Sequence, residues 1–211
     1  TNGVQPNPFV DVPDVRSRKR QELGLGEAEV IVGTDAVLSK QKGIPDLLQA
    51  AIGLQRIGSR IKFLIVGGGP MEAELRSAVR ELGLARVVVF AGWRSDVQEL
   101  LAAVDIFVMS SLWEAMPLTL LEAMAARLPI VATNVGDNYR VTEGGRGALI
   151  VPAADPAALS SAIGRLAMSR DEAQALGRNA QEIFLSRYTF RHMVSAYEHL
   201  YAHLASGSSR V

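Results

Sequence analysis

The chain has 211 residues, 48% of them hydrophobic and 21% charged, a balance that fits one large folded domain and excludes extensive disorder. Lys plus Arg equals Asp plus Glu, which argues against an electrostatic grip on nucleic acid, and the absence of Cys excludes disulfides, thiol catalysis and Cys-ligated metals. The apolar runs are too short to span a bilayer. Since the first residue is Thr1 rather than Met, we expect a larger parent protein.

Short apolar runs alternate with helical periodicity along the chain. Residues 1–13, with three prolines, predict an interdomain linker, residues 14–205 a nucleotide-sugar-binding domain, and residues 206–211 a flexible tail. Strands are expected at residues 30–33, 61–66, 87–91, 105–109, 130–132 and 148–151, and helices at 14–23, 44–57, 71–82, 95–103, from Pro117, and at 156–167, 170–187 and 190–205. Asp14 and Ser95 are expected to cap their helices. Continuous apolar strands separated by helices predict an α/β fold, a Rossmann-like parallel six-stranded sheet with helices on both faces.

Two glutamates, Glu114 and Glu122, flank the predicted start of a helix. Pro117 is favoured in the first turn of a helix, which places Glu114 in the preceding loop and Glu122 inside the helix. Leu118, Leu121 and Ala125 recur at helical spacing and are expected to face the core. The free N–H groups and dipole of a helix start form an anion site, and flanking carboxylates accept hydrogen bonds from hydroxyls. This pattern suits a sugar nucleotide.

Four other features each allow two interpretations. The glycines at 67–69 form either a phosphate loop or, as we favour, a turn that packs a helix on a strand, because Glu72 stands where a dinucleotide fingerprint needs its third glycine. Trp93 and Arg94 form either a plain loop or a nucleobase contact. His199 and His203, spaced i and i+4, are expected on a surface face rather than on a metal. The apolar stripe of the last helix is expected in the core, the alternative being a missing domain that covers it.

Several segments, read in order, carry a specific resemblance. The chain resembles the C-terminal, donor-binding domain of a GT-B-fold retaining glycosyltransferase of family 4, from residue 1 to about 204. The segments are Val37-Leu38-Ser39-Lys40-Gln41-Lys42-Gly43 for RLxxxKG, residues 65–70 for IVGxGP, Phe90-Ala91-Gly92 with Asp96 for FxGxxxD, residues 103–108 for an Ala-Asp-hydrophobic strand, Glu114 to Glu122 for E-x7-E, and residues 129–133 and 144–152.

The resemblance implies a role for each matching residue. Lys42 corresponds to the lysine that binds the donor diphosphate, Glu114 to the acid that holds the sugar hydroxyls, and Glu122 to the one that holds the ribose. We expect Lys42 and Glu114 to be the catalytic residues. The implied donor site is completed by the backbone of Ala115, Met116, Pro117 and Leu118, and by Trp93 and Arg94 near the base.

The resemblance also implies a metal-free transfer of a hexose-type sugar with no cofactor, which agrees with the absence of an Asp-x-Asp motif. The expected partners are a UDP-, GDP- or ADP-linked sugar and the protein's own N-terminal acceptor domain, which is missing from this chain, with no nucleic acid. The expected location is the cytoplasm, with peripheral membrane contact only through the missing domain. The isolated chain is expected to be inactive.

Some positions depart from the family pattern. Val37 replaces the arginine of RLxxxKG and so removes one phosphate contact, and Arg127 stands at a turn where glycine is usual. A sugar-nucleotide epimerase of the same fold therefore stays open as an alternative, as does a degenerate nucleotide-binding module without catalysis.

Overall fold

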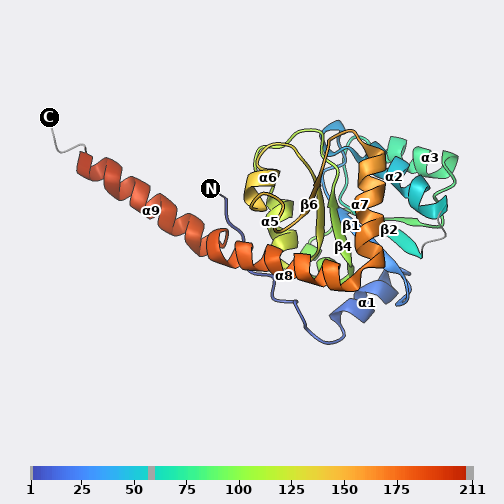
Figure 1. Cartoon of the computed structure of the whole chain (residues 1–211), viewed down its shortest axis with the longest axis horizontal. Helices are drawn as coiled ribbons and strands as arrows, with labels where there is room; N and C mark the ends of the chain where they lie inside the picture. The colour runs from blue at the N-terminus through green and yellow to red at the C-terminus, as the bar shows by residue number, and fades with distance from the viewer. Residues whose placement is uncertain (1, 57–59, 208–211) are drawn as a thin grey trace.

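A parallel sheet forms the centre of the computed structural model, which describes residues 2–56 and 60–207 (Figure 1). In these residues the sheet has six strands in the order β3-β2-β1-β4-β5-β6, and each neighbouring pair is parallel. The predicted fold class is thereby confirmed. The strands are β1 (Val30–Asp35), β2 (Ile61–Val66), β3 (Val88–Gly92), β4 (Ile106–Met109), β5 (Ile130–Thr133) and β6 (Leu149–Val151).

Helices cover both faces of the sheet. One face carries α2 (Ile44–Arg56), α3 (Glu72–Glu81) and α7 (Pro156–Met168), and the other carries α4 (Val97–Ala103), α5 (Leu118–Ala125) and α6 (Asn138–Val141). The remaining helical elements are α1 (Val15–Glu22), which packs on α4, the short 3₁₀ turn η1 (Lys40–Lys42), α8 (Arg170–Arg187), and α9 (Phe190–Gly207), which runs away from the body of the domain (Figure 1).

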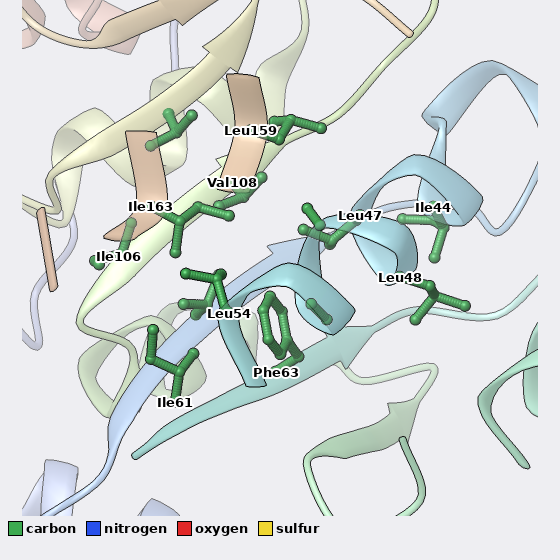
Figure 2. Packing of buried hydrophobic residues seen from close by; sticks show 14 of the residues in the cluster. Ile44, Leu47, Leu48, Leu54, Ile61, Phe63, Ile106, Val108, Leu159 and Ile163 are labelled. Atoms are coloured by element: carbon green, nitrogen blue, oxygen red, sulfur yellow. The ribbon is translucent and has the colours of Figure 1, made fainter. Parts of the chain in front are cut away.

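The apolar core lies in two layers, one on each side of the sheet. In the first, Leu47 and Leu54 of α2 meet Phe63 of β2, while Leu159 and Ile163 of α7 lie over β4 (Figure 2). In the second, strand residues of the opposite parity pack under α5 and α8. Successive strand residues point to opposite faces, and here both faces are covered, so the strands are mostly apolar instead of alternating between apolar and polar residues.

An ion-pair cluster anchors α1 below the sheet. The buried guanidinium of Arg20 donates to Asp105 (2.6 Å) and to the carbonyls of Gly26 and Glu29. Asp105 also accepts the backbone N–H of Ile31 at 2.7 Å. The Ala-Asp segment of the sequence pattern thus has a structural role, which sequence reasoning did not assign.

Most predicted elements occur within two residues of their expected bounds, and the differences concern caps and exposure. Ser95 does not cap α4, whose first residue follows Asp96, and Asp14 precedes α1 with φ 66° and makes no side-chain cap. The short helix α6 was not predicted. The last helix includes Ser206 and Gly207 of the predicted tail, whereas residues 57 and 208–211 lie outside the described part of the chain. No helix within residues 2–56 and 60–207 is long and apolar enough to cross a membrane.

The expectation that the stripe of the last helix lies in the core is wrong for α9. Tyr188, just before the helix, is buried, but side chains along α9 are exposed by a third to two thirds: Phe190 44%, Val194 36%, Tyr197 48%, Leu200 49%, Tyr201 64% and Leu204 57%. Periodicity shows which face of a helix is apolar, but it does not identify what that face contacts.

Candidate functional site

Lys42, Glu114 and Glu122 lie at the carboxyl edge of the sheet, where β1 and β4 are neighbours, whereas Trp93 and Arg94 lie on the loop after β3. The chain continues from β1 to β2 on one side, whereas β4 leads to β5 on the other, so the topology reverses between them. Open parallel sheets bind ligands at this point. The loop after β1 carries Lys42, and the loop after β4 carries Glu114.

Lys42 and Glu114 form an ion pair. The distance from Lys42 Nζ to Glu114 Oε1 is 2.6 Å, and the Glu114 side chain is only 6% exposed. The hydroxyl of Ser111 donates to the same oxygen at 2.8 Å. The two residues that sequence analysis assigns to phosphate and to sugar are therefore each other's partners in this structure.

The backbones of the two loops are locked together. The amide of Leu112 donates to the Gln41 carbonyl (2.7 Å), and the hydroxyl of Ser110 donates to the Lys42 carbonyl (2.9 Å). Gly43 has φ 59°, and a Cβ there would collide with the Ser110 carbonyl, so only glycine allows this approach. Lys42 is therefore held at a fixed place relative to the Glu114 loop.

The helix α5 begins as the sequence predicts. Pro117 is its N-cap, in extended conformation and with no side-chain cap, so no side chain satisfies the first N–H groups of the helix. The preceding backbone is fixed by a hydrogen bond from the Asp137 amide to the Ala115 carbonyl (2.9 Å). Leu121 and Ala125 are buried, but the expectation that Leu118 faces the core is wrong, because it is 49% exposed. Leu120 and Leu121 of the same turn are fully buried, so Leu118 lies on the outer side of a turn whose other side packs in the core.

Two carboxyl groups, Glu122 and Asp35, lie at this edge without an ion pair or side-chain hydrogen bond to another described residue. Burial, and then the negative charge of Asp35, raise the pKa of Glu122 to about 7. Burial also raises the pKa of Asp35, and the charge of Lys42 opposes this effect. Sequence reasoning missed Asp35, although an acid at the carboxyl end of an apolar strand is a usable signal.

Arg94, in the loop after β3, forms ion pairs within the domain. Arg94 pairs with Asp96 (2.6 Å) and with Glu22 of α1 (2.5 Å), and Arg94 is the main cause that lowers the pKa of Asp96. Trp93 is 80% exposed beside it. A nucleobase contact by either residue stays a prediction.

The glycine turn after β2 is explained by packing. Cβ atoms on Gly67 and Gly69 would collide with the backbones of Ala36 and Leu38, which belong to the loop after β1. This supports the interpretation as a packing turn. His199 and His203 lie on α9, and across residues 2–56 and 60–207 no three His, Cys, Asp or Glu side chains gather as a metal site requires.

The hollows of the surface differ in place and size. A small cavity of about 10 Å³ lies at the site, lined by residues that include Asp35, Lys42, Ser110 and Thr119. A larger hollow of about 770 Å³ lies at the opposite edge, where β1 and β4 begin. Its lining includes Arg16, Arg127, Arg170 and Arg178 together with acidic residues, and it contains none of the predicted site residues.

Comparison with known proteins relates this geometry to a family. The model of the family described as glycosyl transferases group 1 matches residues 15–183. The N-acetyl-alpha-D-glucosaminyl L-malate synthase of Bacillus anthracis is 29% identical over 86% of this chain and 48% of its own length. A GDP-mannose-dependent alpha-(1-6)-phosphatidylinositol monomannoside mannosyltransferase of Mycolicibacterium smegmatis is 30% identical over 90% of this chain and 52% of its own length. The chain thus spans about half the length of these relatives.

Solved structures agree with the sequence comparison. HepE of Anabaena, in complex with UDP and glucose, superposes with a TM-score of 0.86 at 26% identity, over 97% of this chain and 55% of that one. The sucrose-phosphate synthase of Thermosynechococcus elongatus superposes with a TM-score of 0.85 at 26% identity, over 98% of this chain and 52% of the synthase chain. Family and fold both follow from these matches: the chain belongs to the group 1 glycosyl transferases, as a C-terminal domain of the GT-B fold.

Proposed function

We propose that this chain is the donor-binding half of a retaining, family 4 glycosyltransferase that transfers a hexose-type sugar from a nucleoside-diphosphate sugar. The observation that carries the proposal is the meeting of Lys42 and Glu114 beside an uncapped α5 at the reversal point of the sheet. A cation, free N–H groups and a buried carboxylate are what a diphosphate linked to a neutral sugar requires.

The proposed mechanism exchanges partners at the ion pair. The diphosphate takes Lys42 and the first N–H groups of α5, and the sugar hydroxyls replace Lys42 as donors to Glu114. The oxygen of an acceptor hydroxyl bonds to the anomeric carbon on the face that the diphosphate leaves, and its proton passes to the departing phosphate oxygen. As the bond between sugar and phosphate breaks, negative charge grows on the leaving diphosphate. The fixed positive end of α5 and Lys42 stabilise this charge, so these groups supply catalysis without a cofactor. Glu122 receives the ribose.

The acceptor is proposed to bind mainly to a preceding domain, since the matched relatives are about twice as long as this chain. The exposed stripe of α9 is the proposed contact with that domain. The start of α9 lies beside the N-terminal segment of the chain. There the Val4 amide donates to the Tyr188 carbonyl at 3.0 Å, and the Phe190 amide donates to the Val4 carbonyl at 2.8 Å. We also propose that the full-length protein is cytoplasmic and that it contacts the membrane peripherally, through that preceding domain.

The α9 contact predicts a domain-specific effect. In the full-length protein, the double change Leu200→Ser and Tyr201→Ser is expected to weaken domain association by about 2–4 kcal/mol, because each buried apolar side chain contributes about 1.5–3 kcal/mol before losses. Calorimetric unfolding of full-length protein should then show two separate transitions. Glu198→Ser, on the same helix, is the control. A single unchanged transition in the double variant contradicts the proposal.

The proposed function is tested by calorimetric titration of the chain with UDP-, GDP- and ADP-linked sugars. We expect weak binding of one of the three classes and no sugar transfer by the isolated chain. Measurable sugar transfer by this chain alone contradicts the proposal that this chain binds the donor and a preceding domain binds the acceptor. Failure of the full-length protein to bind any of them favours a degenerate module, and an isomerised sugar nucleotide without transfer favours an epimerase. NMR of the transferred linkage decides retention.

A further inference from the structure

Asp35 lies at the carboxyl end of β1 and lines the small cavity of the site. It is the last residue of β1, and residues of one parity in a strand share one face of the sheet. Ile31, of the same parity, packs in the core layer beneath α5 together with Leu121 and Met124. Asp35 therefore stands at the carboxyl edge on the face that α5 covers.

Glu122 approaches the same point from the helix. Thr119 precedes it by three residues, and residues three apart lie on one side of a helix. Thr119 lines the small cavity together with Asp35 and Lys42. The Coulomb effect of Asp35 on Glu122 agrees with this geometry.

These two carboxyl groups differ from Asp105 and Glu114, two other sheltered acids of the domain. Asp105 accepts hydrogen bonds from Arg16, Arg20 and a backbone amide, and Glu114 accepts them from Lys42 and Ser111. Among the residues that the structure describes, Asp35 and Glu122 receive no such donor. Both side chains are half-buried, and their carboxyl oxygens are therefore acceptors that a ligand with hydroxyl donors can use at this edge.

We propose that Asp35 joins Glu122 in binding the ribose of the donor, each carboxyl group accepting a hydrogen bond from one of the two neighbouring ribose hydroxyls. The inference rests on the proposed function. Lys42 lines the same cavity as Asp35, so a phosphate at Lys42 brings the adjoining ribose within reach of both carboxyl groups. Carboxylates are established acceptors for ribose hydroxyls in nucleotide-binding sheets.

The charged groups at this point make the choice of ligand group specific. Lys42 is paired with Glu114, so the edge holds one cation against three acidic side chains, Asp35, Glu114 and Glu122. Neutral hydroxyls satisfy the two unpartnered carboxyl groups without adding negative charge, which a further phosphate oxygen would do. Asp35 thus selects for an intact ribose and contributes little attraction to the phosphates.

The test compares UDP, GDP or ADP, whichever the chain binds most tightly, with the 2′-deoxy and 3′-deoxy forms of the same nucleotide. The wild-type chain is expected to bind each deoxy form about tenfold more weakly, since each loses a hydrogen bond to a charged acceptor. Asp35→Val is expected to remove the discrimination against one of the two deoxy forms and to keep the discrimination against the other. Glu122→Ala is expected to show the opposite pattern. Asp35→Asn should retain part of it, because an amide oxygen still accepts.

The ratio of dissociation constants is the readout, because loss of the Asp35 charge also relieves repulsion of the phosphates in general. Asp171→Asn, on the exposed start of α8, is the matched control for a changed charge, and thermal unfolding checks that each variant folds. Full discrimination against both deoxy forms in Asp35→Val overturns the role of Asp35 and leaves the proposed function intact. A wild-type chain that binds none of the three nucleotides overturns both.

Discussion

Replacing Lys42 with Met is expected to weaken nucleotide-sugar binding by about a hundredfold or more. The change removes the cation from the proposed diphosphate site, and a hydrogen bond to a charged group contributes about 1.5–3 kcal/mol, or about ten- to more than a hundredfold. It also leaves the buried Glu114 carboxylate beside the phosphates without its partner. Position 37, where the family pattern has an arginine, is Val in this chain, so no cation at that position can compensate for the loss of Lys42.

Stability and binding can be separated with a second change. Lys42→Met alone is expected to destabilise the domain by about 1–3 kcal/mol, because a buried charge loses its counter-ion and Lys42 is itself partly exposed. Adding Glu114→Gln should restore most of that stability, measured by urea unfolding, while calorimetric titration still detects no donor binding. Lys40→Met, a neighbouring lysine of η1, is the control. A dissociation constant of folded Lys42→Met within threefold of wild type contradicts the assigned role.

Replacing Glu122 with Gln is expected to stabilise the domain above neutral pH and to weaken donor binding. The folded-state pKa of Glu122 is raised from 4.5 to about 7, so the folded state holds the proton more tightly than the unfolded state does. The contribution of Glu122 to the free energy of unfolding is therefore highest below pH 4.5 and is lost as pH rises through 7. Gln mimics the protonated form at every pH.

The expected gain of Glu122→Gln is about 1–2 kcal/mol at pH 8.5, after allowance for solvent screening of a half-buried group, and close to zero at pH 4.5. Urea unfolding at the two pH values measures it, with Glu74→Gln on α3 as the control. Nucleotide affinity should fall about tenfold, because the ribose exchanges a charged acceptor for a neutral one. If Glu122→Gln and the wild type have the same free energy of unfolding at pH 8.5, the charge of Glu122 does not destabilise the folded state. If their nucleotide affinities are equal, the assignment of Glu122 to the ribose is wrong.

The fold was predictable because the strands are mostly apolar runs, a pattern that a sheet covered on both faces imposes. The residues of the site were predictable as far as they lie in segments with a family pattern, such as Lys42, Pro117 and Glu122. Two features of the site were not. The pairing of Lys42 with Glu114 and the approach of Asp35 to Glu122 depend on which strands are neighbours, and the chain order does not state this.

Exposure was the other quantity that sequence periodicity did not determine. Leu118 and the stripe of α9 repeat at helical spacing like core residues, yet Leu118 is exposed although Leu120 and Leu121 of the same turn are buried, and α9 leaves the domain. The four-residue α6 is too short for its period to register. Helical periodicity groups residues on one face but does not say how far the contact with the core extends along that face.

The central claim is that the edge between β1 and β4 binds a nucleoside diphosphate through Lys42 and the start of α5. A crystal structure of the chain with the nucleotide that binds most tightly tests it directly. We expect the diphosphate within hydrogen-bond distance of Lys42 Nζ and of the first N–H groups of α5, the ribose beside Glu122, and the Lys42–Glu114 pair opened. A nucleotide bound instead in the arginine-lined hollow at the opposite edge, with that pair unchanged, would contradict the account.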